Sequence, residues 1–133
     1  MNTEVDASVR VTVLPSPTDK TRTDVMMAVS DPVRDTGRPP LRVRTVQYER
    51  DLPRLKHMAT LGLTFHCLEA RNAGFDDVLF AGRDGSLSEG SAWNIAFWDG
   101  TQIVWPDGPH LAGITMKLLR DGLRELGVPD TSR

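Results

Sequence analysis

The chain of 133 residues lacks the features that mark several large classes of protein. It has a single cysteine, Cys67, so an intrachain disulfide is excluded and a reducing cytoplasm is expected. No apolar run approaches the roughly 18 residues that a membrane-spanning helix needs, and the acidic start of the chain lacks the apolar region of a signal peptide. The formal net charge is only -2, which predicts neither a nucleic-acid partner nor a membrane surface.

What is present is ordinary for a soluble globular protein. Hydrophobic residues make up 39% of the chain and charged residues 26%, and the length suits one domain with a modest core. Because Cys67 falls in an apolar helical stretch, it is predicted to be a small buried residue rather than a nucleophile. The three histidines show no metal-ligand spacing with other histidines, cysteines or carboxylates, so no metal site is predicted.

Residues 1–40 are predicted to form two strands and a proline-rich connector. Val9–Leu14 alternates with period two and Val25–Val29 is a short apolar run, so each predicts a strand. Residues 15–24, rich in proline, serine, threonine and charge, predict a loop between them. The three prolines of Asp31–Pro40 predict a stiff, irregular connector.

Residues 41–133 are predicted to form one domain of strands, hairpins and helices, so the fold class is predicted to be α+β with a mixed sheet. One helix is expected to begin at Asp51–Arg54, with Asp51 as its N-cap, and to run to Ala73 before Gly74. Another is expected over Ile114–Leu126 and is ended by Gly127. Its predicted core residues are Met116, Leu118, Leu119 and Leu123. The predicted strands and turns are Leu41–Tyr48, Val78–Phe80, the turn Arg83–Ser86, and a hairpin of Trp93–Trp98 and Thr101–Trp105 around Asp99-Gly100.

Three features of this second region together predict a site for pyridoxal phosphate. Lys56 has an amine that can form a Schiff base. Glu89, in a Ser-Glu-Gly-Ser turn, has a carboxylate that can keep a pyridine nitrogen protonated. The run Gly113-Ile114-Thr115 opens a helix, whose free N–H groups and partial positive charge can hold a phosphate. Taken alone these are a common surface lysine, turn carboxylate and helix start, so the prediction depends on their combination.

The order of these motifs resembles that of the class IV, or fold-type IV, aminotransferases that depend on pyridoxal phosphate. That family includes branched-chain aminotransferases, D-amino-acid aminotransferases and aminodeoxychorismate lyases. The resemblance covers residues 41–127, and each motif is weak by itself while their joint order is fairly specific. Four runs carry it: Arg50–His57, Glu69–Asp77, Asp84–Ile95 and Leu111–Thr115.

The resemblance implies a role for each site residue. Lys56 would be the Schiff-base lysine and proton shuttle, and Glu89 the partner of the pyridine nitrogen. Ile114 and Thr115, after Gly113, would be phosphate ligands, and Asn94 would support the turn that follows the glutamate.

The resemblance also implies the fold and the reaction. Residues 41–133 would be a shortened form of the larger, cofactor-binding domain of the D-amino-acid-aminotransferase-like fold, preceded by the strands and connector of 1–40. The implied reaction is transamination between an amino acid and a 2-oxo acid, in a homodimer. The cytoplasmic location and the lack of nucleic-acid and membrane partners are expectations from composition.

Several departures from the family pattern leave alternatives open. Ala96 stands where an aromatic residue is usual, Trp105 where threonine is usual and Met116 where a basic residue is usual, while Leu61 replaces the tyrosine of branched-chain enzymes. Family members are also about twice as long, so a truncated or divergent short form is expected. The alternatives are a lyase of the aminodeoxychorismate lyase type and a non-catalytic scaffold or interaction protein that retains part of the fold.

Overall fold

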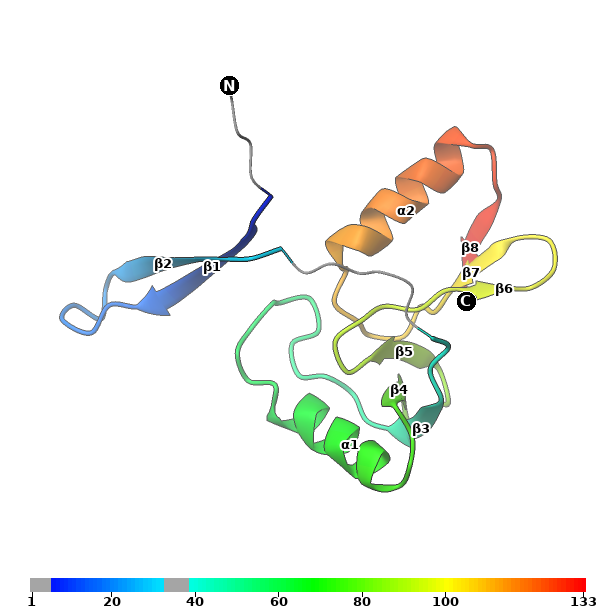
Figure 1. Cartoon of the computed structure of the whole chain (residues 1–133), viewed down its shortest axis with the longest axis horizontal. Helices are drawn as coiled ribbons and strands as arrows, with labels where there is room; N and C mark the ends of the chain where they lie inside the picture. Colours follow the sequence, from blue (N-terminus) through cyan, green and yellow to red (C-terminus); the bar gives the residue numbers. More distant parts are fainter. Residues whose placement is uncertain (1–5, 33–38) are drawn as a thin grey trace. The chain divides into compact units, whose positions relative to one another are not determined.

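The structure is a computed structural model, and it describes residues 6–32 and 39–133 (Figure 1). The chain divides into two compact units, Met1–Pro39 and Pro40–Arg133, and each is described by itself. Within the described residues, neither helix is long and apolar enough to cross a membrane.

The first unit contains one antiparallel hairpin. Strand β1, Ser8–Pro15, pairs with strand β2, Thr23–Ser30, in a register that runs from Ser8 opposite Ser30 to Pro15 opposite Thr23. Both predicted strands are therefore confirmed, and each extends slightly beyond its predicted bounds. The predicted connector falls mostly on residues 33–38, which lie outside the described residues.

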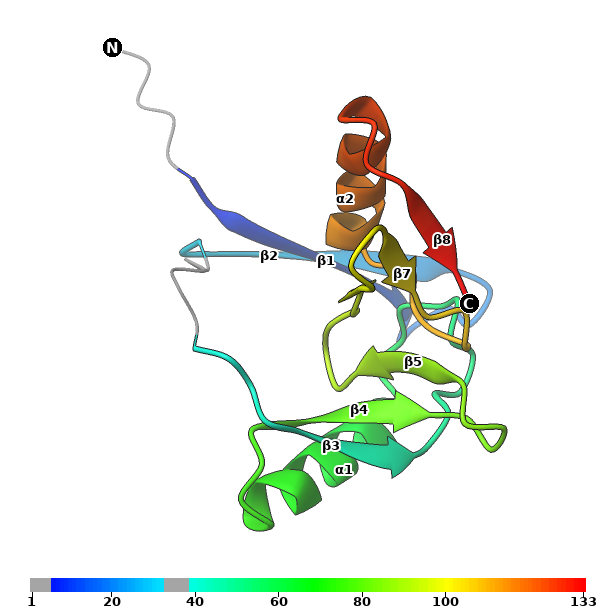
Figure 2. The same cartoon turned by 90° about the vertical axis from the view of Figure 1, so that its right-hand side faces the viewer.

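The second unit begins with a three-stranded sheet in which β4 is the central strand. Strand β3, Val43–Gln47, lies parallel to β4, Asp77–Ala81, and β5, Leu87–Gly90, lies antiparallel to β4 on its other side (Figure 2). Helix α1, Leu61–Asn72, connects the two parallel strands. The strands predicted over Leu41–Tyr48 and Val78–Phe80 and the turn between β4 and β5 are confirmed. Strand β5 was not predicted, and Glu89 lies in it rather than in the Ser-Glu-Gly-Ser turn that the sequence predicted.

The core of this unit lies between β4 and α1. Every residue of β4 is buried, as expected for a central strand that is covered on both sides. Val78 and Phe80 of β4 pack against Leu63 and Ala70 of α1, with Val46 and Tyr48 at the edge of the cluster. Cys67 is buried as predicted. Gly74, with a φ of +84°, follows the helix end at the predicted position.

The prediction that this helix begins at Asp51–Arg54 is wrong, because α1 begins at Leu61. Leu52 has a φ of +46°, a left-handed conformation that a helix cannot contain. The chain therefore turns at that point, and the Leu55 N–H donates to the Leu52 carbonyl at 2.8 Å. Thr60, not Asp51, is the N-cap, and Lys56 consequently lies in an irregular loop rather than in a helix.

A second three-stranded sheet contains the tryptophan-rich hairpin. Strands β6, Phe97–Trp98, and β7, Ile103–Trp105, pair antiparallel around the predicted turn, but both are shorter than predicted. Strand β8, Asp130–Ser132, pairs parallel with β7 and was not predicted. Helix α2, Ile114–Glu125, precedes β8, and Arg120 joins the two by an ion pair of 2.9 Å with Asp130.

The predicted core face of α2 is only partly correct. Met116 is buried, and Leu123 is half-buried. Leu118 and Leu119 are 66% and 55% exposed, so the prediction that they belong to the core is wrong for this chain. Both leucines match the apolar pattern of a helix, but the described residues leave them largely exposed.

The two helical glycines are expected to respond in opposite ways to alanine. A Cβ at Gly62, near the start of α1, would overlap the Tyr48 hydroxyl and ring. We expect Gly62→Ala to lower the free energy of unfolding by about 1–3 kcal/mol, because the tyrosine must move from its packed position. Gly122, in α2, has no atom within 4 Å of such a Cβ, and Gly122→Ala should raise stability by up to about 1 kcal/mol through helix propensity.

Urea denaturation of the two variants beside the wild type measures both changes. Tyr48→Phe in the Gly62→Ala background should recover part of the loss, because the hydroxyl oxygen is the nearest atom to the added Cβ. Equal stabilisation by both alanines would contradict the contact.

Candidate functional site

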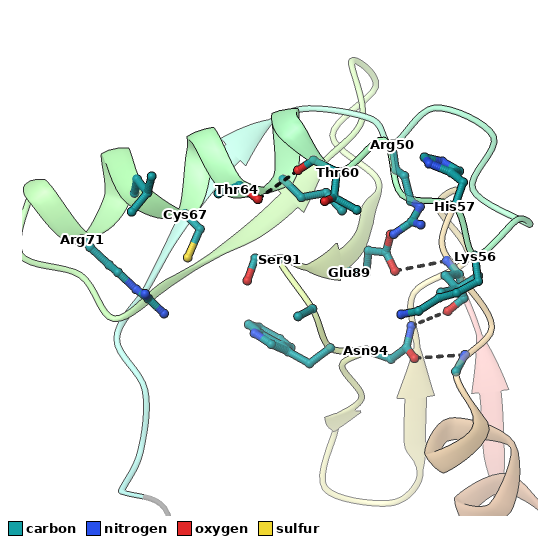
Figure 3. A pocket seen from close by; sticks show the side chains of 16 residues that line it. Arg50, Lys56, His57, Thr60, Thr64, Cys67, Arg71, Glu89, Ser91 and Asn94 are labelled. Atoms are coloured by element: carbon teal, nitrogen blue, oxygen red, sulfur yellow. Dashed lines mark hydrogen bonds between the residues drawn. The ribbon is translucent and has the colours of Figure 1, made fainter. Parts of the chain in front are cut away.

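A cavity of about 380 Å³ lies between α1 and the segments that follow β3 and β5. Figure 3 shows α1 along one side and the chain from Glu89 to Asn94 along the other. Four residues predicted from the sequence line this cavity together: Lys56, Glu89, Asn94 and Gly113. Leu61, one of the departures from the family pattern, is exposed and does not line it.

Glu89, near the end of β5, has a buried carboxylate that is only half satisfied. The residue is 5% exposed. Its Oε2 accepts a hydrogen bond of 3.1 Å from the Leu111 N–H, whereas its Oε1 is buried and has no hydrogen-bond partner among the described residues. A buried acceptor without a donor is costly, so this atom marks a place that a donor can occupy.

Burial raises the pKa of Glu89 above the ordinary glutamate value of 4.5, because the charged form loses its hydration. The Leu111 N–H opposes that shift, and so do the positive charges of Arg50, His110 and Lys56. The carboxylate is therefore surrounded by cations but still holds its proton more strongly than a solvated glutamate does.

Arg50, which lies just after β3, also contributes to the cavity. It is 9% exposed, its Nη2 donates to the Leu55 carbonyl at 3.3 Å, and its Nε is buried without a partner among the described residues. The sequence analysis assigned it no role, although it begins one of the four motif runs. Its proximity to Glu89 depends on the packing of β3 beside β4 and β5.

Lys56 comes from the irregular loop between β3 and α1. The residue is exposed, and its side chain extends toward the side of the cavity that Glu89 and Asn94 occupy (Figure 3). Its charge acts on the Glu89 carboxyl. The structure thus brings together an amine and a carboxylate that are 33 positions apart in the sequence.

Asn94 joins this segment to the start of α2. Its Nδ2 donates to the Leu111 carbonyl at 2.8 Å, and its Oδ1 accepts from the Gly113 N–H at 3.2 Å. Because one side-chain amide holds both ends of the turn Leu111–Gly113, the helix start has a fixed position relative to Glu89.

A second cavity, of about 300 Å³, adjoins the first at the beginning of α2. Ile114 and Thr115 line it, and Asn94 and Gly113 line both cavities. The N–H groups of Ile114 and Thr115 have no hydrogen-bond partner within the described part of the chain, as expected in the first turn of a helix. They combine with the helix dipole to form a place that favours an anion.

Asp77, at the start of β4, fixes the turn beside Glu89. Its Oδ2 accepts from the Trp93 Nε1 at 2.9 Å and from the Ser91 hydroxyl at 3.0 Å, and its Oδ1 accepts from the Val78 N–H. Burial alone would raise the pKa of this carboxyl, but the hydrogen bonds outweigh it and hold the pKa below 3.8. Sequence reasoning did not identify Asp77, because its partners lie 14 and 16 residues away.

In residues 6–32 and 39–133, no group of three histidine, cysteine or carboxylate side chains could hold a metal ion. The chemical groups that meet at the site are therefore an amine, a buried carboxylate, an arginine and a helix start.

The model of the family described as amino-transferase class IV matches residues 1–131. The chain belongs to the class IV amino-transferase family. The predicted family is thus confirmed. A comparison with curated proteins found no match.

Solved structures with a similar fold include the following three. A fold IV-transaminase from Curtobacterium pusillum is 22% identical, with 98% of this chain and 48% of that chain covered and a TM-score of 0.82. A hypothetical aminotransferase from Mycobacterium tuberculosis in its PLP-bound form is 21% identical, with 96% and 50% covered and a TM-score of 0.80. A candidate 4-amino-4-deoxychorismate lyase from Legionella pneumophila subsp. pneumophila str. Philadelphia 1 is 19% identical, with 83% and 42% covered and a TM-score of 0.74.

These structures share the class IV fold with the chain, so the predicted α+β fold class is confirmed. The chain spans about half the length of the structures that it matches.

The two buried carboxylates of the site are expected to affect stability with opposite dependence on pH. Because the folded state raises the pKa of Glu89, the stability it contributes is present below pH 4.5 and is lost as the pH rises through the folded pKa. We therefore expect the free energy of unfolding of the wild type to fall, relative to that of Glu89→Gln, as the pH rises from about 4 to 7. Urea denaturation at a series of pH values measures this difference.

Asp77→Asn is the matched control, because the contribution of Asp77 to stability is expected to depend on pH in the opposite direction. Since the folded state lowers the pKa of Asp77, its contribution is present above pH 3.8 and is lost as the pH falls through the folded pKa. The advantage of the wild type over Asp77→Asn should therefore shrink in acid. If the free energies of unfolding of the wild type and Glu89→Gln changed in parallel with pH, Glu89 would titrate as a solvated residue and the prediction would be wrong.

Proposed function

We propose that this chain carries the pyridoxal phosphate site of a class IV enzyme and supports transamination between an amino acid and a 2-oxo acid. The single observation that carries the proposal is the buried Glu89 carboxylate with its unpartnered Oε1, in the cavity that Lys56 also lines.

The residues of the cavity fit the cofactor. Bound pyridoxal phosphate supplies an aldehyde that combines with amines and a protonated ring that withdraws electrons from the α-carbon of the bound amino acid. The protonated ring nitrogen is a charged donor, which the Glu89 Oε1 lacks. Such a donor beside the carboxylate would also favour the ionised form of Glu89 and so oppose the rise in pKa that burial causes.

Lys56 is proposed to act through its Nζ in two ways. The amine would hold the cofactor covalently while no substrate is present. Once the amino group of the substrate has taken its place, the same amine would carry the proton between the substrate α-carbon and the C4′ carbon of the cofactor, in one direction in the first half of the reaction and in the opposite direction in the second. Its position on an exposed loop leaves room for both tasks.

The start of α2 is proposed to bind the phosphate. The N–H groups of Ile114 and Thr115 and the Thr115 hydroxyl are donors at a helix N-terminus, where the dipole adds to the attraction for an anion. Asn94 supports this part of the site because its amide holds Gly113, which lies immediately before the helix. Arg50 beside Glu89 would limit the cost of burying that negative charge.

A lyase reaction is the second candidate, since the chain also shares its fold with a candidate 4-amino-4-deoxychorismate lyase. The two functions share every residue named above, so the site does not separate them. Product analysis with and without a 2-oxo acid acceptor does, because only transamination consumes the acceptor. A non-catalytic scaffold is the third, and it predicts no covalent capture at Lys56.

Location in the cytoplasm and assembly as a homodimer remain predictions, as does the division into an N-terminal segment and a cofactor-binding domain. The amino donor and the 2-oxo acid are proposed as partners by chemical class only.

Lys56→Ala is expected to abolish covalent capture of the cofactor. The wild type with added pyridoxal phosphate should develop a visible absorption band, and borohydride reduction should leave the cofactor attached to Lys56. The variant should show neither, because no other lysine lines the cavity among the described residues. Absorption spectroscopy and peptide mass spectrometry measure the two results.

The chain offers matched controls for that experiment, since its only other lysines are Lys20 and Lys117. Both are exposed and neither lines the cavity, so alanine at either position should leave the band unchanged. A band that persists in Lys56→Ala, or a label spread evenly over the three lysines, would rule out the Schiff-base assignment.

Gly113→Ala is expected to weaken the binding of pyridoxal phosphate more than that of pyridoxal. The added Cβ would overlap the Asn94 Oδ1 and displace the start of α2. Loss of one charge-assisted hydrogen bond of about 1.5–3 kcal/mol corresponds to a roughly 10- to 100-fold weaker affinity. Fluorescence titration with both compounds measures the difference, with Gly122→Ala as the helical control; equal losses for both compounds would exclude a phosphate effect.

A further inference from the structure

The loop that carries Lys56 needs its own means of fixation, because Asp51–Thr60 contains no helix or strand. Its backbone hydrogen bonds are short-range, from the Leu55 N–H to Leu52, from the His57 N–H to Leu55 and from the Thr60 N–H to Met58. None of these three reaches across the loop. A catalytic amine on such a segment has many positions available unless side chains reduce them.

The imidazole of His57 makes the connection across the loop. Its Nε2 lies 2.7 Å from the Asp51 carbonyl oxygen, and its Nδ1 lies 3.2 Å from the Ala59 nitrogen. A carbonyl can only accept and a backbone N–H can only donate, so Nε2 donates and Nδ1 accepts. The ring is thus neutral with its proton on Nε2, and it joins the first part of the loop to the last.

Lys56 lies between the two residues that the ring connects. Figure 3 shows the side chains of Lys56 and His57 leaving the loop in different directions. Both residues line the cavity, but the amine extends toward Glu89 and Asn94, whereas the imidazole bonds to the backbone of its own loop. Arg50 adds a longer bond of 3.3 Å to the Leu55 carbonyl. His57 makes two hydrogen bonds within the loop, and both are shorter than that of Arg50.

We propose that His57 is a positioning residue for Lys56: its neutral imidazole, bonded at both nitrogens, holds the loop so that the lysine amine meets the cofactor in the reactive orientation. This inference rests on the function proposed above. His57 touches neither the substrate nor the reacting atoms in this role. A displacement of about 1 Å at a reacting group can slow a reaction by about 100-fold, so loss of these two hydrogen bonds is expected to slow the reaction of Lys56.

Three substitutions separate the two hydrogen bonds. In His57→Asn the side-chain oxygen stands near the position of Nδ1 and can still accept from Ala59. In His57→Gln the side-chain amide nitrogen stands near the position of Nε2 and can still donate to Asp51. His57→Ala removes both bonds.

The experiment is the time course of pyridoxal phosphate capture, in which borohydride quenches aliquots and mass spectrometry counts the label at each lysine. The label at Lys20 serves as an internal reference for non-specific reaction in the same molecule. We expect capture at Lys56 to be about 10- to 100-fold slower in His57→Ala, with His57→Asn and His57→Gln between that variant and the wild type. Capture at Lys20 should not change.

Hydrogen exchange at the Ala59 amide gives a readout that does not depend on the cofactor. It should be slow in the wild type and in His57→Asn, and fast in His57→Gln and His57→Ala, because only the first two retain an acceptor. Thermal unfolding identifies any variant that has lost the fold. If His57→Ala is such a variant, His57→Asn and His57→Gln test the positioning role, because each removes only one of the two hydrogen bonds.

The outcomes separate this inference from the proposed function. Capture at Lys56 in His57→Ala as fast as in the wild type would overturn the positioning role and leave the function standing. Capture in the wild type that is no faster at Lys56 than at Lys20 would overturn the function and the inference with it.

Discussion

One side-chain amide determines how two parts of the candidate site, the buried carboxylate and the helix start, are arranged. Asn94 holds both the Leu111 carbonyl and the Gly113 N–H, while the N–H of Leu111 donates to Glu89. The same turn therefore fixes the carboxylate that would face a pyridine ring and the helix start that would face a phosphate. Without the amide, the Leu111 carbonyl and the Gly113 N–H lose their partner, and the distance between the two binding points is no longer set.

The parallel pairing of β3 and β4 places the other half of the site. Because α1 must cross from one strand to the other, the chain needs a connection before the helix, and that connection carries Lys56. Asp77 at the start of β4 fixes the turn of Ser91 and Trp93, which forms the opposite wall of the cavity. The amine and the carboxylate thus meet through sheet topology, and helix packing on β4 supplies the rigidity that the irregular segments lack.

The sequence was sufficient for the elements whose signals are local. Periodicity and turn residues predicted both strands of the first hairpin, the strand β4, the turn at Asp99-Gly100 and the helix ends before Gly74 and Gly127. The helix start was not predictable in this way, because Leu55 and Met58 match a helical period although Leu52 turns the chain. Strand β8 is defined by its pairing with β7, which no local pattern predicts. The exposure of Leu118 likewise depends on which parts of the chain pack against α2. For the same reason Asp77 could not be assigned a role and the proximity of Arg50 to Glu89 could not be predicted, since tertiary contacts bring the partners together. The partners of His57 are local, but they depend on a loop that was predicted to be a helix.

The contact between Tyr48 and Gly62 has a practical consequence for spectroscopy. Tyr48 is the only tyrosine of the chain, and its ring lies 5.0 Å from that of Phe80 and 4.9 Å from that of His66. A fluorine or carbon label introduced through tyrosine would therefore give a single resonance, with no assignment needed. That resonance would report on the packing of α1 against its sheet. The tyrosine ring is suited to this purpose because it lies against the backbone of α1 at Gly62, where there is no room for a Cβ atom.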